Sequence, residues 1–231
     1  ARASVIPQDN SGTLHSSSPF QQARTNAARG EVSGMLELGG YYYHGEGGVS
    51  QDFSLAMSWF ERAAKHGSAE AQFNIATMYR QGHGVIHNAE TARRLYIKAA
   101  EQGDAKAQYS LGILYFKGEG FLRDHYKALL WFSKSVLQGN ALAQVAIGNM
   151  YHFGMEFLQD DDRTQQWYLK AASQGLAAAQ TNMVIMHFNG FGVTKDRAIA
   201  LEWLTKAAKG GDAEAKRYFA KSGFRTQQQR E

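Results

Sequence analysis

Apolar and small residues recur along this chain at helical spacing, and glycines interrupt the pattern at a fixed interval. Between Ala69 and Arg80, the residues Ala71, Ile75 and Met78 fall near one face of a helix. Five glycines lie 36 residues apart, at Gly67, Gly103, Gly139, Gly175 and Gly211. A fixed period of this length is the mark of a repeat architecture, so the chain is predicted to be a row of similar units.

Each unit predicts two helices joined by a short turn. The first helix ends at a Gly-x-Gly pair, because glycine adopts left-handed backbone geometry at low cost. An acid or amide at the N-cap position of the second helix follows in every unit: Asp52, Asn88, Asp124, Asp160 and Asp196. The second helix carries a large residue that we expect to fill the space between the helix layers: Trp59, Leu95, Trp131, Trp167 and Trp203.

The predicted fold class is all-α, a right-handed α/α solenoid (superhelix) of about five 36-residue helix-turn-helix repeats with a capping helix at both ends. The solenoid covers 18–223, with repeats at about 31–67, 68–103, 104–139, 140–175 and 176–211. A capping helix is expected at 18–29, with Ser18 as N-cap and Pro19 at the first helical position, and another at 212–222. Residues 1–17 are predicted to be disordered and 224–231 to form a frayed tail.

Composition narrows the chemistry. The 231 residues include no cysteine, which excludes disulfides, thiolate catalysis and Cys-based zinc sites. The net charge of +4 is spread through alternating basic and acidic residues, so we expect no nucleic-acid partner. No apolar run approaches the roughly 18 residues that would cross a bilayer, so no transmembrane segment is expected.

The residues that could carry chemistry each have a structural interpretation. The run 160–162 is acidic, but Asp160 is in register with the capping residues of the other units. His83 and His87 have a metal-ligand spacing but straddle a turn without a third ligand, and His187 replaces a packing tyrosine. The Gly-x-Gly pairs lack the longer signature of a phosphate-binding loop. We therefore expect no catalytic residue, no cofactor and no metal site, and predict that the chain is not an enzyme.

The segments "AQFNIATMYRQGHGV", "AQYSLGILYFKGEGF" and "AQTNMVIMHFNGFGV" are each followed by an acid or Asn and a helix of the second type. This pattern resembles the Sel-one-like repeat family, relatives of tetratricopeptide repeats, over roughly Gly30 to Gly223. Departures are Glu156 for the second glycine of the fourth unit, and Leu95 for Trp. The resemblance implies an α-solenoid whose concave face, lined by the first helix of each unit, binds another protein or peptide.

Alignment to the tetratricopeptide pattern gives the side chains expected to face that groove. They combine large apolar residues with amides and a few cations. The predicted partner-binding residues are Leu36, Tyr43, Phe73, Asn74, Thr77, Arg80, Tyr109, Ser110, Ile113, Phe116, Lys117, Asn149, His152, Phe153, Thr181, Asn182, Ile185, Phe188 and Asn189. Further inward positions are His44, Glu70, Lys106, Leu142 and Val145.

The function predicted from this surface is a non-catalytic scaffold or adaptor that binds a partner protein in its concave groove. Two alternatives stay open, an immunity protein that neutralises a secreted antibacterial effector and an enzyme acting on a cell-wall-type substrate. The opening "ARAS" fits the small-x-small pattern left by signal-peptide cleavage. With the bacterial relatives that the resemblance implies, this favours a periplasmic or exported monomer over a cytoplasmic one.

Overall fold

The computed structural model describes residues 18–155, 159–213 and 215–217. After α1 (Pro19–Ala28), helices alternate between two layers. The inner helices are α2 (Val32–His44), α4 (Ala69–Gln81), α6 (Ala105–Lys117), α8 (Ala141–His152) and α10 (Ala177–Asn189). The outer helices are α3 (Phe53–Lys65), α5 (Ala89–Glu101), α7 (His125–Val136), α9 (Asp161–Ser173) and α11 (Arg197–Lys209).

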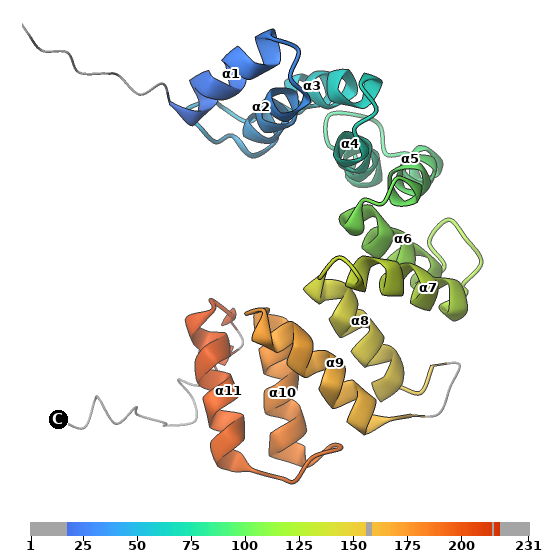
Figure 1. The fold of residues 1–231 in the computed structure, drawn as a ribbon, viewed down its shortest axis with the longest axis vertical. Helices are drawn as coiled ribbons and strands as arrows, with labels where there is room; N and C mark the ends of the chain where they lie inside the picture. The colour runs from blue at the N-terminus through green and yellow to red at the C-terminus, as the bar shows by residue number, and fades with distance from the viewer. Residues whose placement is uncertain (1–17, 156–158, 214, 218–231) are drawn as a thin grey trace, which may run out of the picture.

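The helix pairs follow a curved path, so that α1 and α11 lie at the two ends of an arch (Figure 1). Helices α4, α6 and α8 border the open side of the arch, and α5 and α7 lie on its far side. The described residues contain helices, turns and bends but no strand. The prediction of an all-α solenoid of helix-turn-helix repeats is therefore confirmed. The predicted segments 1–17 and 224–231, and most of the predicted closing helix 212–222, lie outside the described residues.

The predicted N-caps of the outer helices are present in all five repeats. In each, the side-chain oxygen of the acid or amide accepts a hydrogen bond from a backbone N–H in the first turn, as Asp124 does from Lys127 at 2.9 Å. Such a cap replaces water at a donor that the helix itself cannot satisfy. Ser18 caps α1 in the same way, with Pro19 as its first residue. The carboxylate of Asp160 is thus a cap, as its register predicts.

Each repeat is held together by a large side chain of the outer helix that lies on a small or short residue of the inner helix. The buried members of this set are Phe60, Tyr96, Phe132, Tyr168 and Leu204. The fit is close, since a Cβ added to Gly112 of α6 would lie 2.5 Å from Cδ1 of Phe132. Gly39 and Gly148 meet Phe60 and Tyr168 in the same way. Small residues on the inner helix therefore let the two helices approach.

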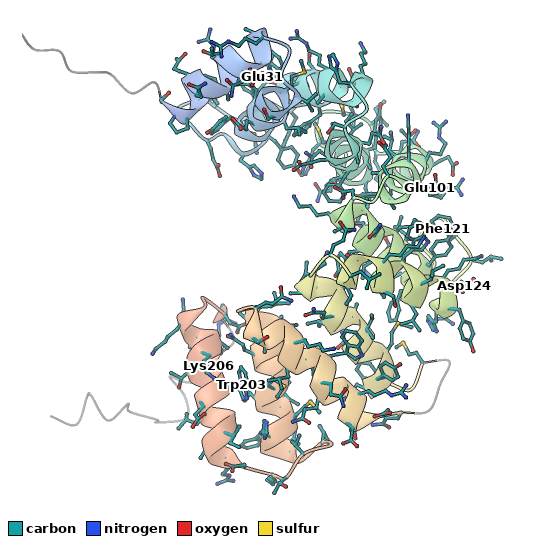
Figure 2. All side chains as sticks on the ribbon, viewed as in Figure 1. Glu31, Glu101, Phe121, Asp124, Trp203 and Lys206 are labelled. Atoms are coloured by element: carbon teal, nitrogen blue, oxygen red, sulfur yellow. The ribbon has the colours of Figure 1, made fainter. Side chains whose placement is uncertain are left out.

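The predicted role of the tryptophans needs correction, because they are half-buried and the core position is one residue later. One face of each indole packs on the core, and the other lies beneath a cation three residues further along the outer helix. The Lys206 Nζ atom lies 4.2 Å from the ring centre of Trp203, and both residues are labelled on α11 in Figure 2. The same pairing recurs at Trp59, Trp131 and Trp167. A helix turns about 100° per residue, so a shift of one position moves a side chain out of the core.

Neighbouring repeats meet at the second glycine of the Gly-x-Gly pair. A Cβ on Gly84 would lie 2.6 Å from Cβ of Phe53, the first residue of the preceding outer helix. Gly192 stands in the same relation to Asp161. These glycines also have positive φ, +71° at Gly84. They are therefore turn residues, as predicted, and in addition contact points between successive repeats.

Glutamine pairs, each with one buried member, connect the two helices of the second, third and fourth repeats. A glutamine of the inner helix accepts from one that follows the outer helix, in Gln72–Gln102, Gln108–Gln138 and Gln144–Gln174, at 2.7–2.9 Å. In the last repeat, Gly210 stands where these three repeats have the glutamine that follows the outer helix. The Oε1 atom of Gln180 is accordingly buried without a hydrogen-bond partner. An unsatisfied buried acceptor lowers the stability of the fold.

We expect Gly210→Gln to stabilise the chain. Gly210 has φ −71°, a conformation that any residue adopts, and the new amide would donate to Gln180 as its counterparts do. The expected gain in the free energy of unfolding by urea is about 1–2 kcal/mol. Gly210→Ala is the matched control, since it gains only the backbone part. Equal stability of the two variants would contradict the pairing.

Candidate functional site: a track along the inner helices

Three consecutive hollows run along the inner helices, and we call them together the inner track. Adjacent hollows share lining residues, Thr77 between the first and the middle, and Tyr109 and Ile113 between the middle and the third. The shared residues make the track continuous across α2, α4, α6 and α8. The first, middle and third hollows have volumes of about 250, 370 and 120 Å³.

The first hollow lies between α2, α4 and α6 and combines apolar with polar side chains. It is lined by Leu36, Gly40, Tyr43, His44, Phe60, Glu70, Asn74, Thr77 and Lys106. The Tyr43 hydroxyl donates to Oε1 of Gln81 at 2.8 Å and lies 2.9 Å from Nδ1 of His83. Lys106 Nζ lies 3.6 Å from Glu70 Oε1, so the charges of this hollow largely cancel.

The middle hollow combines an aromatic floor with cations. It is lined by Phe73, Thr77, Arg80, Gln81, Tyr96, Tyr109, Ser110, Ile113 and Lys117. The rings of Phe73 and Tyr96 have centroids 5.8 Å apart, and the Tyr96 hydroxyl is hydrogen-bonded to that of Thr77 at 3.0 Å. Arg80 and Lys117 are exposed. The hollow therefore offers an apolar surface beside two positive charges.

The third hollow, between α6, α7 and α8, has no charged residue in its lining. It is lined by Tyr109, Ile113, Phe116, Phe132, Leu142, Val145, Ala146 and Asn149. Leu142 is 47% exposed at its rim. Asn149 Oδ1 accepts from the buried Tyr168 hydroxyl, which fixes the orientation of the amide. The surface is apolar with one oriented amide.

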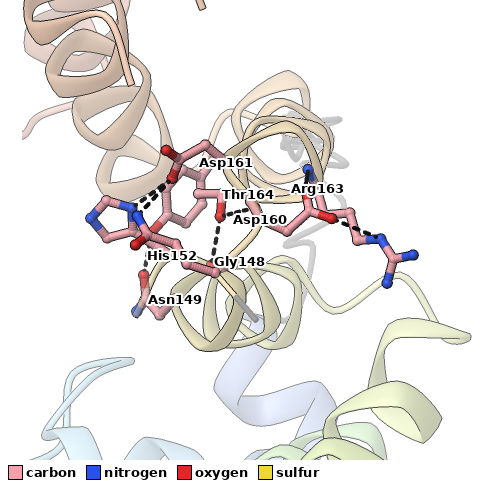
Figure 3. Close-up of polar contacts among 9 residues, drawn as sticks. Gly148, Asn149, His152, Asp160, Asp161, Arg163 and Thr164 are labelled. Carbon is pink, nitrogen blue, oxygen red and sulfur yellow. Dashed lines mark hydrogen bonds and ion pairs between the residues drawn. The ribbon is translucent and has the colours of Figure 1, made fainter. Parts of the chain in front are cut away.

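Beyond the third hollow, His152 and Phe153 lie at the end of α8 rather than in the lining. His152 Nδ1 lies 3.5 Å from Asp161 Oδ1, the first residue of α9 (Figure 3). The imidazole also contacts Phe153 and Phe191, with ring centroids 4.9 and 5.8 Å away. His152 therefore joins α8, α9 and the next turn. Phe153 is 65% exposed.

A separate hollow of about 400 Å³ lies at the last inner helix, and we call it the end hollow. It is lined by Thr181, Val184, Ile185, Phe188, Asn189, Leu204 and Ala215. The Thr181 hydroxyl is buried and has no hydrogen-bond partner in the structure. Most of its lining is apolar, so the end hollow resembles the third hollow of the track.

Sixteen of the predicted partner-binding residues line these four hollows, and none of the nineteen is buried. The three outside the hollows are His152, Phe153 and Asn182. Sequence reasoning missed Tyr96 and Phe132, which reach the track from the outer helices. The sequence feature that could have revealed them is a large residue directly after the tryptophan of the outer helix, or after Leu95, which replaces it.

Sequence reasoning also missed an exposed apolar stripe that runs along the outer helix α7 and the residues just before and after it. Its members are Leu122, Tyr126, Leu130 and Leu137, with exposed fractions of 53–91%. In the other repeats, the positions equivalent to Tyr126, Leu130 and Leu137 hold polar or charged residues or alanine. Comparing equivalent positions among the repeats would have revealed the stripe.

Burial changes the ionisation of the tyrosines around the track. It raises the pKa of Tyr168, beneath the third hollow, to about 12. Burial also raises the pKa of Tyr96 and Tyr109, and the positive charge of Arg80 opposes the rise at both. These phenols therefore stay neutral hydrogen-bonding groups at physiological pH.

Within the part of the chain that the structure describes, no three His, Asp or Glu side chains gather as a metal site would require. His83 instead stacks on Phe53, with ring centroids 4.7 Å apart, and contacts Tyr43. No described helix has the length and apolar character needed to span a bilayer.

Paired helices with a continuous inner track define a helical repeat protein of the solenoid class. The Sel1 repeat family matches five consecutive segments, residues 32–68, 69–104, 105–140, 141–176 and 177–212. The chain belongs to the Sel1 repeat family. Sel1 repeat proteins are protein-interaction scaffolds, and their fold is typically non-catalytic.

Similar proteins were found both by sequence and by structure. Over 70 residues the chain is 39% identical to protein sel-1 homolog 2 of Rattus norvegicus, which covers 30% of this chain and 10% of the rat protein. A Sel1 repeat protein from Oxalobacter formigenes is 32% identical with a TM-score of 0.75, over 87% of this chain and 58% of that one. An immunity protein from Pseudomonas aeruginosa shares the fold at 19% identity and a TM-score of 0.66, over 84% and 73% of the two chains.

Tyr168→Phe should lower stability at neutral pH by about 1 kcal/mol, because the hydrogen bond to Asn149 is lost. The raised pKa of Tyr168 contributes stability that is fully present below pH 10 and is lost as the pH rises toward 12. The difference between wild type and variant should therefore shrink between pH 10 and about 12. Urea unfolding at several pH values measures it. A constant difference would contradict the assignment.

Proposed function

We propose that this chain is a non-catalytic adaptor that holds a partner protein in its inner track. The observation that carries the proposal is the continuity of the track. Partly exposed rings from successive repeats line it, with one part of each ring against the core and the rest open to a partner. Aromatic anchors beside adaptable polar groups are what protein interfaces use.

We propose further that the adaptor works outside the cytoplasm of a bacterium. The likeness to a bacterial Sel1 repeat protein at 32% identity supports the bacterial setting, and the fold shared with an immunity protein of Pseudomonas aeruginosa supports a role in the envelope. The immunity role is the second form of the proposal. It differs only in the partner, which would be a secreted toxin.

The test is capture of a partner from extracts of the source organism, with the purified chain as bait and mass spectrometry as the readout. Tyr109→Ala combined with Phe116→Ala removes two rings from the track and should abolish capture of a stoichiometric partner. Leu142→Glu places a charge at the rim of the third hollow without emptying it, and should weaken capture as well.

The matched control is Leu130→Ala with Leu137→Ala, which removes two apolar side chains from the outer stripe on α7. It should leave capture unchanged, and circular dichroism should show equal helicity in all variants. Unchanged affinity in the Tyr109/Phe116 variant would remove the track as the binding surface. A captured assembly component supports the adaptor, and a captured toxin supports the immunity role.

A further inference from the structure

We propose that the middle and third hollows together bind an extended acidic segment of the partner. An Asp or Glu side chain of that segment lies between Arg80 and Lys117. A large apolar side chain three residues away fills the third hollow. This inference rests on the proposed function and names the chemistry of the partner.

The two positive charges of the middle hollow, on Arg80 and Lys117, favour binding of an anion. No acidic residue lines it, and no ion pair joins Arg80 to a carboxylate within the described ranges. Lys117 Nζ lies 3.5 Å from Glu119 Oε1, but both side chains are about half exposed, so that pair is weak. Arg80 is exposed, so its guanidinium is accessible to a ligand, and its planar N–H donors can bind a carboxylate with two parallel hydrogen bonds.

The neighbouring hollows differ in charge, which gives the acid a single place. The lining of the first hollow includes the acid Glu70 beside Lys106, whereas the lining of the middle hollow has two cations and no acid. The lining of the third hollow is uncharged and includes Phe116, Leu142 and Val145. An acidic side chain therefore gains most in the middle hollow, and an apolar one in the third.

The spacing of the hollows fits an extended peptide. The two hollows lie on either side of α6, and packed helices stand roughly 8–10 Å apart. A polyproline II segment has three residues per turn and rises about 3.1 Å per residue. Side chains three residues apart then lie on one side, roughly 9 Å from each other.

Such a segment has no internal hydrogen bonds, so its backbone needs partners in the track. Asn149 has its Oδ1 engaged by Tyr168, which leaves the Nδ2 group to donate to a peptide carbonyl. Asn74 and Gln81 offer further amide groups along the first and middle hollows.

The experiment is selection of a random peptide library, displayed on phage, against the immobilised full chain. Selected peptides should carry Asp or Glu three positions from a large apolar residue. Synthetic copies should bind about tenfold more weakly to Arg80→Gln/Lys117→Gln, measured by fluorescence anisotropy. Arg94→Gln/Lys98→Gln removes the same charge from exposed positions on α5 and should bind as wild type does.

Replacing the peptide's acid by its amide should cause the same loss with the unchanged chain, a readout that no folding defect of a variant can mimic. Selected peptides without acidic enrichment, or binding that Arg80→Gln/Lys117→Gln leaves unchanged, would overturn the inference. If the binding of such peptides is still lost in the Tyr109→Ala/Phe116→Ala variant, the proposed function stands although the acidic segment is ruled out. Enrichment of no peptide would overturn the inference, and partner capture would then decide the proposed function alone.

Discussion

The structure depends on one repeated contact, in which a large side chain of the outer helix lies on a small residue of the inner helix. Gly112 beneath Phe132 is the clearest case, because even one added carbon would come within 2.5 Å of the ring. This contact sets how closely the two helices of a repeat approach. It also fixes the rotation of the inner helix, and so places Tyr109 and Phe116, one helical turn to either side of Gly112, partly against the core and partly in the open. The track is lined largely by such side chains.

The contact also explains why track residues vary while the fold persists. The buried positions must match in size between the two helices, but the track positions are only partly buried and keep an exposed part that no neighbour constrains. Phe73, Tyr109, Val145 and Thr181 occupy equivalent positions in successive repeats and differ in size and polarity. That variation gives each hollow its own chemistry, with an acid and a cation in the lining of the first, two cations and no acid in the middle and an uncharged lining in the third. In the proposed function, the order of the hollows would select the partner.

Alignment to the tetratricopeptide pattern gave the side chains expected in the groove, and periodicity was sufficient to predict the helices and the capping residues. Those features depend on local backbone chemistry, which repeats with the sequence. The depth of burial could not be read in the same way, because Trp131 and Phe132 are adjacent, both large and both apolar. Only the position of Gly112 decides which of them enters the core. The exposed stripe on α7 was missed for a related reason, since an apolar residue on a helix is expected to face inward.

The most direct test of the account is amide hydrogen exchange of the chain with and without its captured partner. The account predicts that the partner slows exchange in the inner helices α4, α6 and α8 while the outer helices stay unchanged. Protection confined to α7 and the turn before it, where Leu122, Leu130 and Leu137 are exposed, would contradict it. The partner would then bind the outer face of the solenoid, and the inner track would have no part in holding it.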